Sequence, residues 1–437
     1  MDRTDRPHVV VVGAGLAGLS AALVAARSGA HVTVLERAGA PGGRATTANE
    51  KGFLFNIGPH ALYAGAEQML AELGVAVAGE HPPLGRTVAW RGGKRYRLPL
   101  GGASFLATGL LGVRDKLEAG RFFASLGRMD TALLHGVTAR DWLATSIHSP
   151  RLRQLTEALF RVSSYANGPE VASAGAHLDQ LRAASRRPVR YIDGGWQTIV
   201  DALRLRVAEA GVTVHTAARV DSVTADAEGW RTRLASGDEL RADSVILALG
   251  PTEAARLVAG AGGAALARWA GAATPVQAAT LDVALSSLPV PKVTYSIGID
   301  RPLYWSVHTA AAQLAPEGGA VIHAATYLPH GEPHDYAAIE RELDQLMEAL
   351  QPGWRNLLVH RRFVPHLMVT NAFVTAAAGG LPGRPRPEVP GAPGLFVAGD
   401  WVGPVGMLAD SALASGMSAG ELAAAVEARG REPAEVT

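Results

Sequence analysis

The first 35 residues alternate between hydrophobic runs and segments that interrupt them. Residues 8–12 and 31–35 are short runs rich in valine, and residues 19–28 between them carry mostly small and apolar side chains. Short apolar runs of β-branched residues are typical of buried strands, and a longer run of small residues fits a helix. The pattern therefore predicts a strand, a helix and a second strand. Three glycines form a turn between the first two elements: Gly13, Gly15 and Gly18.

Beyond this unit the pattern changes twice. Residues 88–190 have largely helical spacing of apolar side chains and look like an insertion. Four short runs with strand character follow, separated by turn residues: 212–215, 219–224, 230–234 and 244–249. We expect these strands to return to the first sheet. The remaining predicted elements are a strand-rich region, a helix, a Pro/Gly-rich connector, a strand and a helix, at 276–325, 336–350, 379–394, 395–398 and about 408–428.

Length, charge and cysteine content narrow the classes of function. At 437 residues the chain suits two domains better than one core. Lys plus Arg (41) nearly balance Asp plus Glu (40), so the net charge is +1 and nothing favours a nucleic-acid partner. The chain has no cysteine, which excludes disulfides, thiolate metal sites and a cysteine nucleophile, and we predict no metal site. Redox chemistry would have to belong to a bound cofactor.

No segment of the sequence predicts a membrane span. Residues 1–7 are polar and lead directly into the first strand, without the features of a signal peptide, so we expect a cytoplasmic enzyme. The longest apolar stretch outside the glycine turn, residues 98–113, is interrupted by glycines and is too short to cross a bilayer. We interpret it as a buried helix that roofs a substrate cavity. The alternative is an interfacial lip with at most peripheral membrane contact.

The glycine-rich turn has the spacing of a dinucleotide-binding site. Gly13 permits the tight reversal, Gly15 lets the backbone approach a pyrophosphate, and Gly18 lets the helix pack on the strand. The helix N-terminus favours the anion. Glu36 ends the second strand, where an acid binds the ribose, and its carboxylate would repel a 2′-phosphate. These residues predict NAD or FAD and argue against NADP.

Further motifs distinguish these two cofactors. Residues 41–45 read Pro-Gly-Gly-Arg-Ala, and residues 53–60 read Phe-Leu-Phe-Asn-Ile-Gly-Pro-His. Residues 191–196 read Tyr-Ile-Asp-Gly-Gly-Trp, and residues 399–401 read Gly-Asp-Trp. With these motifs the chain resembles the superfamily of FAD-dependent amine oxidases and phytoene desaturases, which share a glutathione-reductase-like FAD domain.

The resemblance implies a binding site for FAD built from both ends of the chain. Arg44 would offset the charge of the pyrophosphate, and Asp400 would accept from the ribitol. The amides of Gly406 and Met407 would face the carbonyl edge of the flavin, and the backbone of Val220 would touch the adenine end. The predicted cofactor-binding residues are Gly13, Gly15, Leu16, Ala17, Gly18, Glu36, Arg37, Gly42, Gly43, Arg44, Gly58, Pro59, His60, Val220, Gly399, Asp400, Gly406 and Met407.

The resemblance also implies the fold class. We expect an α/β protein with a glutathione-reductase-like Rossmann domain for FAD and an inserted α+β substrate domain. The cofactor domain would be discontinuous and comprise residues 1–87, 191–255 and 380–437. Residues 88–190 and 256–379 would form the substrate-binding domain.

The expected reaction is the removal of a hydride from a small or medium apolar molecule held over the flavin. Many amine oxidases of the superfamily carry a lysine near the flavin, on a strand of the second domain. The comparable strand here, residues 277–283, has none, and Lys292 is the only lysine in the C-terminal half. This departure favours desaturation of a carbon–carbon bond. An amine or amino-acid oxidase is the first alternative, a porphyrinogen oxidase the second, and an escort-type protein without catalysis the non-enzymatic one.

Two residues within the flavin motifs are candidates for catalysis. His60 would relay a proton or be a hydrogen-bonded turn residue, and Trp401 would wall the flavin or fill a core. Aromatic and histidine residues on the later strands are candidates for the substrate site, with core packing as the alternative: Tyr304, Trp305, His308, His323 and Tyr327. Without a second nucleotide domain, electrons would pass from the reduced flavin to oxygen or a quinone. The sequence does not predict an oligomeric state.

Overall fold

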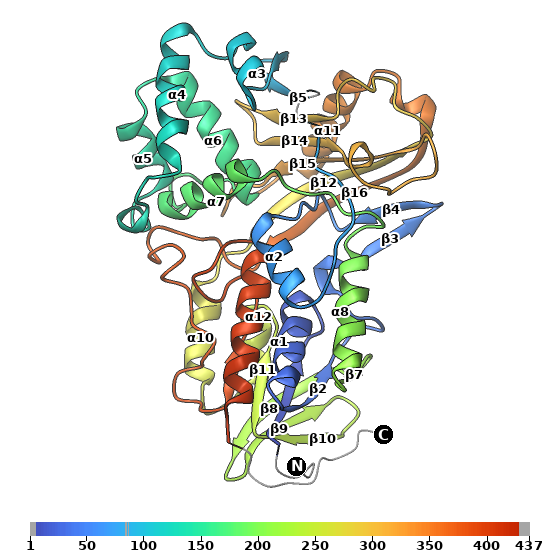
Figure 1. Ribbon diagram of the computed structural model, residues 1–437, viewed down its shortest axis with the longest axis vertical. Helices are drawn as coiled ribbons and strands as arrows, with labels where there is room; N and C mark the ends of the chain where they lie inside the picture. Colours follow the sequence, from blue (N-terminus) through green and yellow to red (C-terminus); the bar gives the residue numbers. More distant parts are fainter. Residues whose placement is uncertain (1–5, 84, 86, 428–437) are drawn as a thin grey trace.

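Five parallel strands from three distant parts of the chain form the first sheet (Figure 1). The computed structural model describes residues 6–83, 85 and 87–427, so the first five and last ten residues of the predicted cofactor domain, with Ala428 of the last predicted helix, lie outside the described residues. The strand order is β17-β11-β1-β2-β7. These strands are β1 (His8–Val12), β2 (His31–Leu35), β7 (Thr213–His215), β11 (Ser244–Leu247) and β17 (Leu395–Val397).

Alternate residues of β1 point to opposite faces of this sheet. Val9 and Val11 pack on helices α1, α8 and α12, whereas Val10 and Val12 pack on a second, smaller sheet and on helices α9 and α10. Because both faces are covered, the whole valine run is buried, as is usual in parallel sheets. The helices concerned are α1 (Leu16–Arg27), α8 (Gln197–Glu209), α9 (Pro251–Leu257), α10 (Gly263–Ala272) and α12 (Ala409–Ala424). The strand–helix–strand prediction is confirmed for β1, α1 and β2.

The middle strands divide between two sheets. Two of the four predicted runs, now β7 and β11, join the parallel sheet. The other two, β8 (Val220–Asp226) and β9 (Gly229–Leu234), pair with β10 (Glu239–Ala242) in an antiparallel sheet of their own. The expectation that all four return to the first sheet is therefore wrong for two of them. Tight turns link consecutive strands here, and such turns favour pairing between neighbours in sequence.

The largest sheet has seven strands in the order β16-β12-β15-β14-β13-β5-β6. Its pairs are antiparallel except for β13 with β5. The strands are β5 (Thr87–Arg91), β6 (Lys94–Arg97), β12 (Val276–Leu285), β13 (Tyr295–Gly298), β14 (Leu303–Val307), β15 (Ala320–Tyr327) and β16 (Leu358–Thr370). The first residues of the segment predicted as helical thus form strands, and helices begin only after them.

Helices cover this sheet from both sides (Figure 1). Helix α11 (Tyr336–Leu350) packs on one face, and α6 and α7 pack on the other. Ser149 and Ser173 begin α6 and α7, because each hydroxyl accepts a hydrogen bond from an amide of the first turn. The remaining helices and a small hairpin are α2 (Ala64–Glu72), α3 (Gly102–Ala107), α4 (Val113–Leu126), α5 (Ala139–Ser146), α6 (Pro150–Ser164), α7 (Ala174–Arg186), β3 (Thr47–Glu50) and β4 (Phe53–Asn56).

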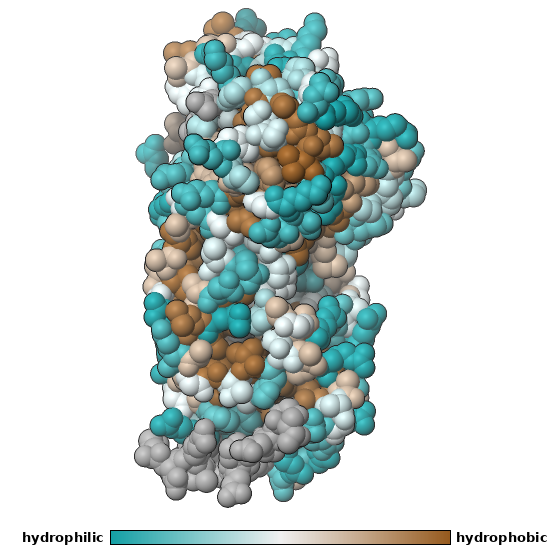
Figure 2. All heavy atoms as spheres, turned by 90° about the vertical axis from the view of Figure 1, so that its right-hand side faces the viewer, coloured by the Kyte–Doolittle hydropathy of each residue, from teal (hydrophilic) through white to brown (hydrophobic). Residues whose placement is uncertain are grey.

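The apolar stretch at 98–113 is not the buried helix that the sequence predicted. It contains the six-residue helix α3, none of whose residues is buried, and Leu106 and Val113 are 74% and 78% exposed. Only Leu98, Leu110 and Leu111 of its large apolar side chains are buried. Frequent glycines keep the segment from forming a longer helix with one apolar face. Within the described residues, no helix combines the length and hydropathy needed to cross a membrane. On the face seen in Figure 2, the largest hydrophobic group lies in the upper half and is ringed by hydrophilic side chains.

Candidate functional site

The three glycines of the first turn differ in what surrounds them. Gly13 has a φ of +102°, and a Cβ there would lie 2.7 Å from the carbonyl oxygen of Ala248. A Cβ on Gly18 would collide with the carbonyl of Gly13. A Cβ on Gly15 would have only one atom within reach, the carbonyl oxygen of Gly42 at 4.0 Å. Gly13 and Gly18 are therefore required by the fold, whereas Gly15 leaves space open beside the turn.

The N-terminus of α1 faces this open space. Gly15 precedes the helix and no side chain caps it, and the first turn holds no acidic residue. The amides of Leu16 and Ala17 begin the helix, and the first amides of a helix have no partners within it. Unpartnered amides and the helix dipole together form a site for an anion such as a pyrophosphate.

Glu36 closes one side of the turn. Its Oε2 accepts a hydrogen bond of 2.8 Å from the Ala14 amide, and its Oε1 accepts one of 2.8 Å from the Ala38 amide. Each carboxylate oxygen keeps a second acceptor position, which a ribose hydroxyl can use. Arg37 beside it is exposed, and the Ala218 amide donates to the Glu36 carbonyl, which brings the start of β8 at Val220 to this end of the site.

The motifs at 41–45 and 399–401 meet at an ion pair. Arg44 Nη1 lies 2.8 Å from Asp400 Oδ2 and donates to the Val369 carbonyl at 2.7 Å. Asn371 donates to Asp400 through both its side-chain Nδ2 and its backbone N–H. Burial alone would raise the pKa of Asp400, but Arg44 and Asn371 outweigh it and hold that pKa below its usual value. The Gly42 amide donates to the Ala14 carbonyl at 2.9 Å, so the motif at 41–45 also contacts the glycine turn. The short 3₁₀ turn at Gly43–Ala45 carries Gly43 and Arg44.

The start of α12 holds a buried carboxyl group. Gly406 has a φ of +61°, and the Met407 side chain packs in a small apolar cluster. Asp410 in the first turn accepts a hydrogen bond of 3.0 Å from the Ala66 amide of α2. Burial raises the pKa of Asp410 to about 6, and the bond from Ala66 only partly opposes this. Asp410 therefore joins two helix N-termini and titrates near neutral pH.

We expect Asp410→Asn to stabilise the protein at pH 8 by about 1 to 2 kcal/mol and to have little effect at pH 4. The pKa of Asp410 is higher in the folded state than the usual carboxyl value of 3.8, so the wild-type protein loses stability as the pH rises from about 4 through about 6. Asparagine stays neutral and can still accept from Ala66. Urea unfolding midpoints of both proteins at pH 4, 6 and 8 test this, and equal midpoints at pH 8 would contradict it.

The motif that contains His60 packs on the seven-stranded sheet. A Cβ on Gly58 would collide with Leu367 of β16 and lie 3.6 Å from Thr280 of β12. His60 Nδ1 lies 3.1 Å from the Gly58 carbonyl, and its ring contacts Trp196 edge-on. Burial is the main reason that the pKa of His60 falls to about 4. His60 is therefore a neutral imidazole whose Nδ1 donates to Gly58, and Pro59 is buried beside it.

The structure separates the five aromatic and histidine candidates. Tyr304, His323 and Tyr327 share one face of the seven-stranded sheet, as their registers with Ala325, Asp282 and Ala278 require. His308 joins them, since its ring contacts His323 at a centroid distance of 4.5 Å. Trp305 points to the opposite face, where its indole N–H donates to the Met347 sulfur in the core against α11. The prediction that Trp305 lines a substrate site is thus corrected, because side chains alternate along a strand.

Trp401 also lies in a hydrophobic core. Its side chain is 2% exposed, packs edge-on against Trp269 and donates from the indole to the Leu249 carbonyl at 2.9 Å. Gly399 next to it is tied by its amide to the Ser415 hydroxyl of α12. Its burial and its used donor favour the core role of Trp401 over a role beside the flavin.

Several residues of the same sheet face were not among the predicted site residues. They are Tyr165, Tyr191, Thr280, Asp282, Tyr295 and Arg362. Tyr191 stacks on His308 at 4.0 Å, and its hydroxyl lies 3.2 Å from that of Tyr304. Tyr191 begins the motif at 191–196, which belongs to the family resemblance. That motif is the one sequence signal that points to Tyr191 as a site residue. Asp282 and Arg362 meet only through strand pairing, for which the sequence carries no local signal.

Polar atoms on this face lack partners within the described residues. They include Thr280 Oγ1, His308 Nε2, His323 Nε2 and Tyr327 Oη. Trp196 Nε1, on the ring that contacts His60, lacks a partner as well. Buried polar groups are nearly always hydrogen-bonded, so these atoms point to a missing partner such as water, a ligand or a cofactor. The glycine turn adds further binding groups: the open side of Gly15, the free amides of α1 and the two acceptor oxygens of Glu36. The Arg44–Asp400 pair lies between the turn and the sheet, since Arg44 also donates to the Val369 carbonyl of β16. This donor and acceptor set fits FAD, whose pyrophosphate the α1 amides would hold.

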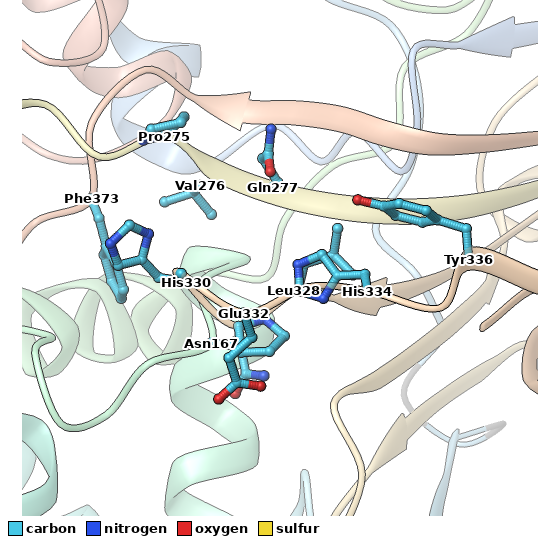
Figure 3. A pocket seen from close by; sticks show the side chains of 12 residues that line it. Asn167, Pro275, Val276, Gln277, Leu328, His330, Glu332, His334, Tyr336 and Phe373 are labelled. Atoms are coloured by element: carbon cyan, nitrogen blue, oxygen red, sulfur yellow. The ribbon is translucent and has the colours of Figure 1, made fainter. Parts of the chain in front are cut away.

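A separate pocket of about 240 Å³ opens at the end of β12 and β15 (Figure 3). In the view of Figure 3, Phe373 and Tyr336 lie at opposite ends of it, with His330, His334 and Gln277 between them. Asn167 in its wall donates to the Tyr327 carbonyl at 3.1 Å. None of the predicted cofactor residues lines this pocket, so it is a feature distinct from the turn.

Sequence relatives match this chain over part of its length. The 4,4′-diaponeurosporene oxygenase of Staphylococcus aureus (strain USA300) is 26% identical over 277 residues, which are 55% of this chain and 55% of that protein. The phytoene dehydrogenase of Streptomyces griseus is 56% identical over 55 residues, which are 13% of this chain and 11% of that protein. The matched regions thus span about half or less of these curated relatives.

Solved structures share the fold over nearly the whole chain. Putrescine oxidase bound to putrescine has a TM-score of 0.75 at 16% identity and covers 95% of this chain and 98% of its own. An oxidoreductase from Methanosarcina mazei has a TM-score of 0.74 at 20% identity and covers 94% of this chain and 99% of its own. The profile of the family described as flavin containing amine oxidoreductase matches residues 16–423. The chain therefore belongs to the flavin-containing amine oxidoreductase family and is an oxidoreductase with FAD as its cofactor.

Proposed function

We propose that the parallel sheet and its helices are a glutathione-reductase-like Rossmann domain for FAD, formed by residues 1–87, 191–255 and 380–437. The seven-stranded sheet and its helices would be the substrate domain, formed by residues 88–190 and 256–379. The distribution of the strands supports this division, since β1, β2, β7, β11 and β17 come from the first set and β12 to β16 from the second. Residue 87 marks the boundary closely, because β5 begins there and belongs to the seven-stranded sheet.

The proposed reaction is FAD-dependent dehydrogenation of an uncharged substrate, with desaturation of a carbon–carbon bond as the first candidate. One observation carries this proposal: the sheet face beside His60 presents neutral groups and one carboxylate that is already paired. Burial lowers the pKa of His308 well below its usual value and that of His60 to about 4. The carboxylate on this face, Asp282, has both oxygens engaged by His323 and Arg362. A cationic ammonium would find no free carboxylate among these residues.

Thr280 supports the same assignment. It lies on β12 within reach of the Gly58 turn, on the strand that the family resemblance compares with the lysine-bearing strand of amine oxidases. Threonine carries no charge and cannot act as that lysine does. Two sequence relatives are named for carotenoid chemistry, which is consistent with desaturation of an apolar molecule.

The residues of this chain would then divide their tasks by position. When bound, FAD supplies the hydride acceptor. The amides of α1 and the Arg44 guanidinium would hold the pyrophosphate, and Glu36 would hold the ribose. The buried tyrosines and histidines of the sheet face would orient the substrate and exclude water. The reduced flavin would pass its electrons to oxygen or a quinone.

Amine oxidation is the second candidate, because the same face is rich in aromatic rings. Tyr165 lies 5.8 Å from Tyr327 and 6.2 Å from Tyr304 between ring centroids. Aromatic faces attract ammonium groups. The fold is shared with putrescine oxidase, although the low identity supports the architecture alone.

The test is anaerobic reduction of the purified flavoprotein by a panel of compounds. Apolar alkenes and their saturated precursors form one arm, and primary and secondary amines form the other. We expect loss of the yellow flavin absorbance with the first arm only. Bleaching by amines alone would replace desaturation with amine oxidation, and measuring hydrogen peroxide when air is readmitted would identify oxygen as the acceptor.

A further inference from the structure

A carboxylate and an imidazole lie fully buried on the sheet face beside His60. Asp282 of β12 and His323 of β15 are both 0% exposed, and Asp282 Oδ1 lies 2.6 Å from His323 Nδ1. The two residues face each other directly in the register of the two strands. Burying two ionisable groups away from water costs free energy unless they are well hydrogen-bonded to each other. The strand register fixes this pair at one place in the fold.

Arg362 keeps the carboxylate ionised. Its Nε and Nη2 donate to Asp282 Oδ2 at 3.1 and 2.6 Å, and Nη2 also donates to the Asn56 carbonyl. Burial raises the pKa of Asp282, yet His323 and Arg362 outweigh that effect and hold the pKa below its usual value. An ionised carboxylate only accepts hydrogen bonds, so the proton of a neutral His323 must be on Nδ1. Its Nε2 then carries a free lone pair.

That free nitrogen has no partner among the described residues. His323 Nε2 is buried and makes no hydrogen bond, and the same holds for Nε2 of the neighbouring His308. Asp282 follows Thr280 on the same face of β12, and Thr280 lies beside the Gly58 turn. The lone pair is therefore on the face where the flavin motif meets the sheet, and not in the core against α11.

The other groups around His323 do not replace it as a base. The elements packed around His323 carry the following titratable or charged groups: Arg362 and His360 of β16, His60 after β4, Tyr191 before α8, Tyr304 of β14 and His308 at the end of β14. Burial keeps His60 and His308 neutral. Neither of them receives a carboxylate that would stabilise a protonated ring, whereas His323 does.

We propose that Asp282 and His323 form the base of the dehydrogenation, with His323 as the catalytic residue and Asp282 as its positioning residue. The inference rests on the proposed function. The substrate C–H bond breaks, and its hydrogen passes to His323 Nε2 as a proton. The electron pair of that bond becomes the new double bond as the adjacent carbon gives up hydride to the bound flavin, which is the oxidant. Asp282 stabilises the imidazolium that results.

The experiment compares the FAD-bound wild type with His323→Gln and Asp282→Asn. The reductant found in the substrate panel is mixed anaerobically with each protein, and the rate of flavin bleaching is followed from pH 5 to 9. We expect the wild-type rate to change with pH, and His323→Gln to be slower by about 10²- to 10⁴-fold without that dependence on pH. Asp282→Asn should be slower by about 10- to 100-fold, because the wrong tautomer becomes accessible.

His177→Gln is the matched control. His177 is equally buried, but both of its nitrogens already lie near partners, Ser164 Oγ at 3.1 Å and the Ser173 carbonyl at 2.9 Å. This variant should keep the wild-type pH profile, even where it lowers stability. A second readout needs no turnover: the visible spectrum of the bound flavin should change with pH in the wild type and not in His323→Gln.

The proposal is overturned if His323→Gln bleaches with the wild-type rate and pH profile, or if only its unfolding midpoint changes. A slow variant whose pH profile is unchanged would assign His323 a structural role and also overturn it. Failure of the proposed function has a different signature, since it is seen in the wild type itself as missing FAD or as bleaching by amines alone.

Discussion

Gly15→Val should abolish FAD binding and leave the fold intact. The space next to Gly15 is open, because a Cβ there would be 4.0 Å from its only near neighbour, the Gly42 carbonyl. Its φ of −80° is accessible to any residue. A valine side chain would therefore fit the protein but occupy the space in which the pyrophosphate approaches the α1 amides. We expect FAD affinity to fall at least about 100-fold, since close backbone approach is what this glycine provides.

The measurement is the flavin content of the purified variant, with its urea unfolding midpoint compared with that of wild-type protein stripped of FAD. The stripped protein is the proper reference, because bound cofactor stabilises only the folded state. Gly18→Ala is the control within the same motif. Its Cβ would collide with the Gly13 carbonyl, so both the fold and FAD should be lost. A yellow Gly15→Val protein with a full complement of FAD would show that the pyrophosphate binds elsewhere.

The part of the molecule that holds the proposed cofactor site was predictable in its fold because its signals are local. The run at 8–12, the glycine turn and Glu36 lie within 30 residues, and each position has one physical requirement that a few residue types satisfy. The structure places Glu36 against the turn through the Ala14 amide. The meeting of Arg44 with Asp400, 356 positions later in the chain, could be expected only from the family resemblance.

The proposed substrate site was less predictable because strand pairing decides which of its side chains lie together. The sequence identified an aromatic and histidine-rich region, but which side chains share a face depends on register. One position separates Tyr304, which faces His323, from Trp305, which faces α11. Asp282 and His323 are 41 positions apart and Arg362 is 80 positions from Asp282, so no spacing motif links them. The prediction of a buried helix at 98–113 was wrong for a different reason, since hydrophobic composition alone does not create a buried face.

Two glycines in helix interiors should respond in opposite ways to alanine. Gly416 of α12 lies against α1, where a Cβ would collide with the Ser20 hydroxyl and the Ala17 carbonyl. Gly120 of α4 is exposed, and a Cβ there would meet no atom within 4 Å. Gly416→Ala should lower the free energy of unfolding by about 2 to 3 kcal/mol, because extra volume in a close-packed contact forces the helices apart. Gly120→Ala should raise it by about 0.5 to 1 kcal/mol, because alanine loses less backbone entropy in a helix.

The contact at Gly416 also links stability to the cofactor. Helix α12 follows the Gly-Asp-Trp motif at 399–401, and α1 follows the glycine turn. Gly420 repeats the close approach one turn later, at Ala21. Forcing these helices apart would move the α1 amides away from Asp400, so Gly416→Ala should weaken FAD binding as well as the fold. Urea unfolding and flavin content of both variants test this together. If Gly416→Ala were as stable as Gly120→Ala, the two ends of the chain would not be held by this contact.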